Sequence, residues 1–153
     1  MTASSREYLA EALGHVFVSM AGLPVRSLEA DMTPDVRSDA LNVKIEFTGG
    51  GSGEIGIVME RPLASLVTCR ILGRSDAPSP SEDTLIEDAL KELANVVCGH
   101  FVTLMYGYTS VFKISIPRVL LIGSAACNML KTNPDVSTFV VESHPLLATV
   151  RIR

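Results

Sequence analysis

The sequence has no tryptophan and few other aromatic residues, with three tyrosines and five phenylalanines among 153 residues. Single-stranded nucleic acid is usually bound by aromatic side chains that stack on bases inside a positively charged groove. Excess positive charge is also missing, because 13 Lys and Arg stand against 17 Asp and Glu, for a formal net charge of −4. Both shortages argue against nucleic acid and anionic membrane surfaces as partners.

Cysteine is scarce, and its spacing indicates no pairing. Cys69, Cys98 and Cys127 are odd in number, and no two of them form a Cys-x-x-Cys motif. This pattern predicts three reduced and mostly buried thiols rather than a disulfide framework. The three histidines have no partner at metal-ligand spacing. We therefore expect no metal site in this chain.

Long hydrophobic runs are absent as well. The longest mostly apolar stretch, residues 119–130, contains Ser124 and Asn128 and is far shorter than the roughly 20 residues of a membrane-spanning helix. Residues 1–11 include Arg6, Glu7 and Glu11 and lack the apolar centre of a signal peptide. The length fits one domain over residues 1–153. We expect a cytoplasmic protein outside the membrane.

Three helices are expected from apolar residues that recur at steps of three and four. The first has its apolar positions between Leu9 and Leu23, with Ser4 or Ser5 as the candidate cap and Gly22-Leu23-Pro24 as the stop. The second, 62–72, opens with Pro62, which suits the first turn of a helix. The third and longest, 82–105, begins with acidic residues that favour the positive end of the helix dipole.

Strands are expected in the rest of the chain. Residues 42–48 and 54–59 are separated by the glycine-rich segment 49–53, which indicates a hairpin. Further strands are predicted over 111–116, 119–122, 136–141 and 147–152, punctuated by Pro117, Gly123, Pro134 and Pro145. The expected fold class is α/β of the layered α+β type, with helices packed on a largely antiparallel sheet. A shift of 81 residues superposes Leu9 on Leu90 and Glu11 on Glu92, which permits a pseudo-two-fold arrangement.

The longest predicted helix carries a polar stripe formed by Asp88, Glu92, Asn95 and Gly99. Steps of four, three and four residues return to nearly the same angle on a helix. Asparagine is a poor residue for a helix interior, because its side chain competes for backbone hydrogen bonds. An acid and an amide at this spacing also occur on ordinary solvated helix faces. The stripe by itself leaves a solvated surface and a functional site both open.

With its surroundings, the stripe resembles the signature of the CheX-type chemotaxis phosphatases of the CheC/CheX family. That signature is an Asp or Ser, three residues, Glu, two residues, Asn, and a proline a little over twenty residues further on. The chain matches it with Asp88, Glu92, Asn95 and Pro117. The proline comes one residue early, a departure that a turn can absorb.

The resemblance extends to the flanks, in Val16-Phe-x-x-Met20 and in Ile45-x-Phe-x-Gly49. Double-site members of the group have two Glu-x-x-Asn pairs. Here the first helix has Glu11 but carries Gly14 where the second amide would stand. The chain therefore resembles the single-site CheX branch.

The resemblance implies a hydrolase that removes the aspartyl phosphate of a phosphorylated CheY-like receiver domain in chemotaxis or another two-component pathway. It implies that Asn95 orients the attacking water and that Glu92 anchors the receiver's lysine. No cofactor would be bound by this chain, since the receiver would supply Mg²⁺, and the CheX branch pairs as a homodimer through sheet strands. Asp88 would either extend the acidic landing surface or only cap and solvate the helix. Gly99 would either let the partner backbone approach or serve packing.

Two functions of other classes remain open. A non-catalytic interaction module of the same fold, like the related domain of flagellar switch proteins, would bind a phosphorylated receiver or an assembly partner without hydrolysis. An unrelated α/β binding domain would carry the stripe by chance. Glu92 and Asn95 standing in register favour the phosphatase.

Overall fold

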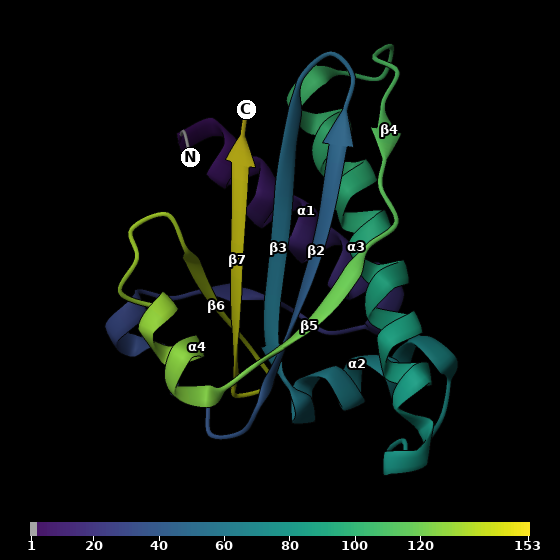
Figure 1. Ribbon diagram of the computed structural model, residues 1–153, viewed down its shortest axis with the longest axis vertical. Helices are drawn as coiled ribbons and strands as arrows, with labels where there is room; N and C mark the ends of the chain where they lie inside the picture. The colour runs from purple at the N-terminus through teal and green to yellow at the C-terminus, as the bar shows by residue number, and fades with distance from the viewer. Residues whose placement is uncertain (1–2) are drawn as a thin grey trace.

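The computed structural model describes residues 3–153 (Figure 1). Met1 and Thr2, which belong to the segment considered above for a signal peptide, lie outside the described residues. The helices and strands follow in the order α1 Ala3–Ala21, β1 Arg26–Ser27, the 3₁₀ turn η1 Ala30–Met32, β2 Ala40–Thr48, β3 Ser52–Glu60, α2 Arg61–Leu72, the 3₁₀ turn η2 Pro80–Glu82, α3 Asp83–Tyr106, β4 Lys113–Ile114, β5 Arg118–Ile122, α4 Ser124–Leu130, β6 Ser137–Val141 and β7 His144–Ile152.

The described strands form one seven-stranded sheet in which every neighbouring pair is antiparallel. The order runs β1-β6-β7-β3-β2, and both β4 and β5 pair with the outer edge of β2. The predicted hairpin is confirmed as β2 and β3, with Val43 opposite Ile57. The two long helices, one from each half of the chain, pack against each other. This is the layered α+β arrangement that the sequence predicts.

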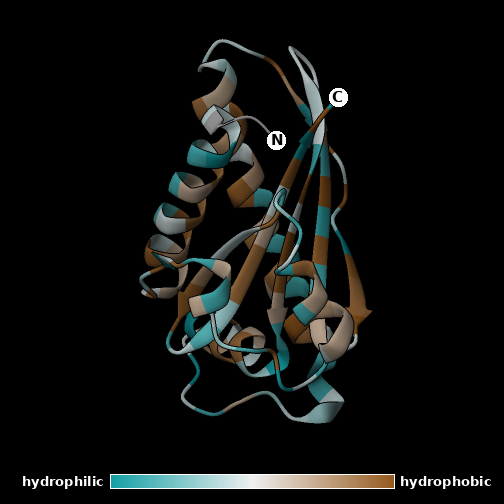
Figure 2. Cartoon of the chain, turned by 90° about the vertical axis from the view of Figure 1, so that its left-hand side faces the viewer, coloured by the Kyte–Doolittle hydropathy of each residue, from teal (hydrophilic) through white to brown (hydrophobic). Residues whose placement is uncertain are grey.

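The sheet buries apolar side chains on both of its faces. Ile45, Ile57 and Ala148 point into the main core beneath α1, α2 and α3. Ala40, Val58 and Leu147 point the other way, into a smaller core that Cys127 of α4 completes. Figure 2 shows this layering from the side, with apolar segments along the strands. Three helices cover one face of the sheet. The outer sides of α1 and α3, which pack against each other, therefore form one solvent-exposed surface.

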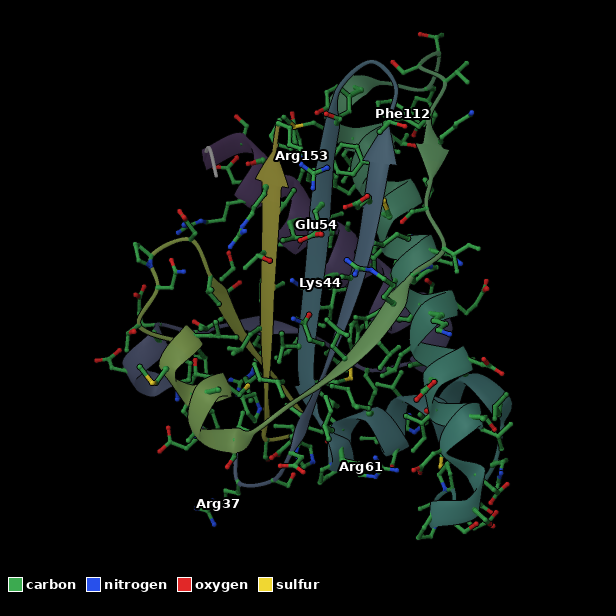
Figure 3. All side chains as sticks on the ribbon, viewed as in Figure 1. Arg37, Lys44, Glu54, Arg61, Phe112 and Arg153 are labelled. Carbon is green, nitrogen blue, oxygen red and sulfur yellow. The ribbon has the colours of Figure 1, made fainter. Side chains whose placement is uncertain are left out.

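The part of the second face that α4 does not cover is polar. Lys44, Glu54 and Arg153 project from it toward the viewer in Figure 3. Glu54 lies 3.9 Å from both Lys44 and Arg118, so one carboxylate is shared by two cations on this face. Among residues 3–153, no helix is long and apolar enough to cross a bilayer.

Two strand predictions need correction. The strand expected over 111–116 is reduced to β4, because Pro117 has no N–H for the ladder and the edge is interrupted before β5. Ser115 bridges this interruption: its N–H donates to the Glu46 carbonyl at 2.8 Å, and its hydroxyl accepts from the Glu46 N–H at 2.9 Å. Pro145 does not end a strand but lies second in β7, opposite Val140.

Helix α4 was not predicted at all. Its seven residues, Ser124–Leu130, lie inside the stretch whose hydropathy indicated only strand and loop. Asn128 fixes it, because the amide bonds the Val36 backbone at both ends: Nδ2 donates to the carbonyl at 2.9 Å, and Oδ1 accepts from the N–H at 2.8 Å. A tertiary contact therefore stabilises a helix too short to be stable alone.

Candidate functional site

Helix α3 is the platform for the predicted stripe, and its N-terminal end is held by several contacts. Ser79 and Glu82 form a capping box at η2, in which the Ser79 N–H donates to the Glu82 carboxylate at 3.1 Å. The Arg74 guanidinium, 2.7 Å from Glu82, holds the pKa of that carboxyl at about 2. Arg61 forms an ion pair with Asp83. These contacts fix where α3 begins.

The core-facing side of α3 determines which residues point outward. Its buried residues are Ile86, Ala89, Leu90, Leu93, Ala94, Val97, Cys98, Phe101 and Val102. On the opposite side, Asp88 and Glu92 are exposed, and Asn95 and Gly99 are half-buried. The structure thus brings the four predicted residues together as one solvent-facing stripe.

The polar side chains of this stripe are not engaged within the chain. Over residues 3–153, no side-chain hydrogen bond or ion pair involves Asp88, Glu92 or Asn95. Asparagine in a helix interior lowers helix propensity, and here no bond to a neighbour compensates for that loss. The fold therefore gives no structural reason for an amide at this position.

The structure also bears on the two residues with open roles. Asp88 lies beyond the first turn of α3, so it does not cap this helix, and the capping box of Ser79 and Glu82 belongs to η2, directly before α3. A side chain at Gly99 would meet no atom within 4 Å, so packing does not require a glycine there. Neither residue is needed to build the helix in its place.

A groove of about 430 Å³ lies beside the stripe, between α1 and α3. His15 of α1 and His100 of α3 stack there, with ring centroids 4.5 Å apart and an interplanar angle of 8°. Sequence reasoning treated these histidines as isolated, because no local spacing connects residues 85 positions apart. Only the packing of the two helices brings the rings together.

Helix α1 supplies the other wall of this surface. Glu11 is exposed and has no side-chain partner among the described residues. Gly14, three residues later, is half-buried, and a side chain there would meet no atom within 4 Å. An acid without an amide is thus present on α1, and the one complete Glu-x-x-Asn pair stands on α3.

Neither the cysteine thiols nor a metal-ligand cluster provides a second candidate site among the described residues. The cysteines are free, and burial raises the pKa of Cys98 to about 12 and that of Cys127 to about 11, so both stay protonated and unreactive. Of the three thiols expected to be mostly buried, Cys98 and Cys127 are buried and Cys69 is half-buried. Within the described part of the chain, no three His, Cys, Asp or Glu side chains group closely enough to hold a metal ion.

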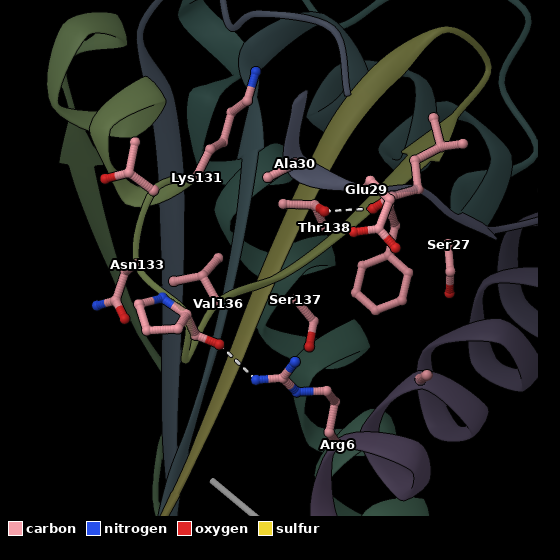
Figure 4. A pocket seen from close by; sticks show the side chains of 14 residues that line it. Arg6, Ser27, Glu29, Ala30, Lys131, Asn133, Val136, Ser137 and Thr138 are labelled. Atoms are coloured by element: carbon pink, nitrogen blue, oxygen red, sulfur yellow. Dashed lines mark hydrogen bonds between the residues drawn. The ribbon is translucent and has the colours of Figure 1, made fainter. Parts of the chain in front are cut away.

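A second hollow of about 440 Å³ lies between the start of α1 and β6 (Figure 4). Arg6 crosses it and donates to the Pro134 carbonyl at 2.5 Å. The Thr138 hydroxyl donates to the Leu28 carbonyl at 2.5 Å on its far side. The hollow shares no residue with the stripe, and its polar groups serve to tie the chain segments around it together.

Comparison with known proteins identifies the family and the fold. The family model described as chemotaxis phosphatase CheX matches residues 41–140, which include all of α3 and the stripe. Among curated proteins, none matches the chain.

Solved structures resemble the whole chain at low sequence identity. A CheX from Desulfovibrio desulfuricans superposes with a TM-score of 0.71 at 15% identity, covering 97% of this chain and 99% of its own. A CheC-like superfamily protein from Shewanella sp. PV-4 gives 0.71 at 19% identity, with 100% and 99% covered. CheX in the CheX-CheY-BeF3-Mg²⁺ complex from Borrelia burgdorferi gives 0.67 at 20% identity, with 99% of each chain covered.

These structures show the fold, and the family model covers most of the chain, from β2 into β6, including the exposed stripe on α3. The chain therefore belongs to the CheX family of chemotaxis phosphatases.

Proposed function

We propose that this chain hydrolyses the aspartyl phosphate of a CheY-like receiver domain, with Asn95 orienting the attacking water and Glu92 anchoring the receiver's lysine. One observation carries the proposal: Glu92 and Asn95 stand one turn apart on the outer side of α3, with no partner within residues 3–153. The CheX of Borrelia burgdorferi, of the same fold, was solved in complex with CheY. An unpaired carboxylate and an unpaired amide on the same side of a helix suit a partner that supplies the phosphorylated residue and its metal ion.

The chemistry requires little from this chain beyond positioning. Hydrolysis of a phosphoryl group depends mainly on an in-line nucleophile and on neutralisation of the phosphoryl charge. The Asn95 carbonyl can accept a hydrogen bond from water, and its uncharged amide does not repel the phosphoryl oxygens. The water oxygen bonds to phosphorus as the bond to the aspartyl oxygen breaks. Inorganic phosphate leaves, and the receiver regains its carboxylate.

We place the Mg²⁺ that neutralises the phosphoryl oxygens on the receiver. On the outer side of α3, only Asp88 and Glu92 offer carboxylates to the stripe, and a magnesium site needs more oxygen ligands than these two supply. Their role is then to attract and orient the receiver: Glu92 pairs with its lysine, and Asp88 extends the acidic surface. We also place the protein in the cytoplasm, beside its receiver.

We further propose a homodimer formed through the open sheet edge of β4 and β5. Leu120 and Leu121 on this edge are 45% and 68% exposed, and Ile116 is 84% exposed. An exposed apolar edge strand favours pairing with a second strand. Leu121→Lys should convert the dimer to a monomer in sedimentation without loss of helical content. A wild-type monomer at micromolar concentration would contradict the pairing.

The phosphatase proposal is tested by following the decay of acid-labile phosphate on a phosphorylated CheY-like receiver from the same cell. Wild type should accelerate the decay, and Asn95→Ala should lower that acceleration by about a hundredfold, the scale of losing one positioned polar group. Asn133→Ala is the matched control, because it removes an amide from an exposed loop away from α3. Equal rates for wild type and Asn95→Ala would overturn the assignment. Receiver binding without faster decay would instead identify a non-catalytic interaction module.

A further inference from the structure

The groove between α1 and α3 is continuous with the candidate site. Gly99 belongs both to the polar stripe and to the wall of the groove, and Val96, next to Asn95, lines it as well. The stacked rings of His15 and His100 form part of its surface. A partner that reaches Asn95 along α3 therefore lies over this groove.

The lining of the groove is mainly apolar. Besides the faces of the two imidazole rings it includes Val96, Leu104 and Tyr108. Val96 is 37% exposed and Tyr108 is 94% exposed, so nothing within residues 3–153 covers this part of the surface. The absence of a side chain at Gly99 keeps the groove open toward the stripe.

Acidic side chains flank the groove on both helices. Glu11 lies one turn before His15 on α1, and Glu92 lies two turns before His100 on α3; both are exposed. Neither carboxylate has a side-chain partner among the described residues. The surface thus has an apolar centre and a negative charge on each helix, which suits an apolar side chain with a basic residue on either side.

We propose that this groove receives an apolar side chain of the phosphorylated receiver, flanked by basic residues that face Glu11 and Glu92, and that the His15–His100 stack is a specificity element for this contact. The inference rests on the proposed function and adds a second contact to it. Helix α1, which carries no Glu-x-x-Asn pair, takes part in receiver recognition through His15 and Glu11.

The stack gives the groove a flat aromatic floor. The two imidazole rings lie 4.5 Å apart and only 8° from parallel, one from each helix. An aromatic face offers a large contact area to an apolar side chain. Replacing the rings by small side chains should therefore remove this contact.

The test measures binding of the receiver, activated with beryllium fluoride, to wild type and to variants of the groove. The double variant His15→Ala/His100→Ala removes both rings and should lower the affinity by about tenfold, the scale of losing an interface anchor. The conservative double variant His15→Phe/His100→Phe keeps two aromatic faces and should recover most of that loss.

Two further variants separate recognition from folding. His15→Lys should weaken binding, and Glu11→Gln should weaken it with a smaller salt dependence, whereas Glu29→Gln, away from the groove, should bind as wild type. Thermal melting confirms that each variant is folded. If the double alanine variant or His15→Lys binds as wild type, the groove contact is overturned while the phosphatase proposal stands. If the wild-type protein does not bind the activated receiver, both are overturned.

Discussion

The carboxylate of Glu60 lies 2.9 Å from Nδ1 of His144, a hydrogen-bonded contact that connects the end of β3 to the start of β7. Glu60 also accepts hydrogen bonds from the Arg37 N–H at 3.2 Å and the Ser38 hydroxyl at 3.4 Å. It is buried, with 7% of its surface exposed. One carboxylate thus holds three chain segments at the end of the sheet away from the β2–β3 turn.

The hydrogen bonds of Glu60 should contribute to the free energy of unfolding at neutral pH, and this contribution should be lost in acid. Burial opposes ionisation of Glu60, but the bonds from His144, Arg37 and Ser38 outweigh it and lower its pKa. A lowered carboxyl pKa gives stability that is complete above the unfolded-state value and is lost as the pH falls through the folded-state value. Glu60→Gln should cost about 2 kcal/mol in urea unfolding at pH 7. The difference from wild type should shrink toward pH 3, and a constant difference would contradict this role.

Replacing Glu92 should separate association from chemistry. Glu92→Ala is expected to weaken receiver binding by about 2–5 kcal/mol, the cost of breaking a desolvated charge pair at an interface. At saturating receiver the rate of dephosphorylation should stay near wild type, whereas Asn95→Ala should lower that rate and leave binding intact. Steady-state measurements of KM and kcat distinguish the two. Glu87→Ala is the matched control, because Glu87 is an exposed acid of α3 outside the stripe.

Gly99→Ala should stabilise the protein and impair its function. A glycine within a helix costs about 0.5–1 kcal/mol relative to alanine, and nothing lies within 4 Å of a side chain added here. The free energy of unfolding should therefore rise by that amount, while the added methyl group obstructs the receiver. Gly14→Ala on α1 is equally unobstructed and should give the same stabilisation. Loss of receiver binding in Gly99→Ala alone is the expected result, and unimpaired binding would remove the role of Gly99.

Asparagine and glycine in the turn between β6 and β7 should stabilise the protein. Glu142 and Ser143 have φ values of 48° and 70°, a left-handed conformation in both residues of a two-residue hairpin turn. Asn and Gly adopt this turn with less strain. Glu142→Asn/Ser143→Gly should raise the free energy of unfolding by about 1 kcal/mol. Ser75→Gly, in an exposed loop without positive φ, should bring no gain, and an equal gain there would contradict the explanation.

Much of this protein was determined by local sequence pattern. The predicted helices and the central hairpin correspond to α1, α2, α3, β2 and β3, because apolar periodicity and glycine or proline boundaries act within a few residues. The outward stripe of Glu92 and Asn95 follows from the same periodicity, since the apolar side of α3 must be buried. The resemblance to CheX rests on these residues.

Tertiary structure decided the rest. Helix α4 depends on the bonds of Asn128 to Val36, and the broken edge at Pro117 depends on its pairing with β2. The stack of His15 on His100 exists only because α1 and α3 pack side by side. Such contacts join residues far apart in the chain, and no local spacing encodes them. Residues of α3 could therefore be assigned from the sequence, but the surface they share with α1 could not.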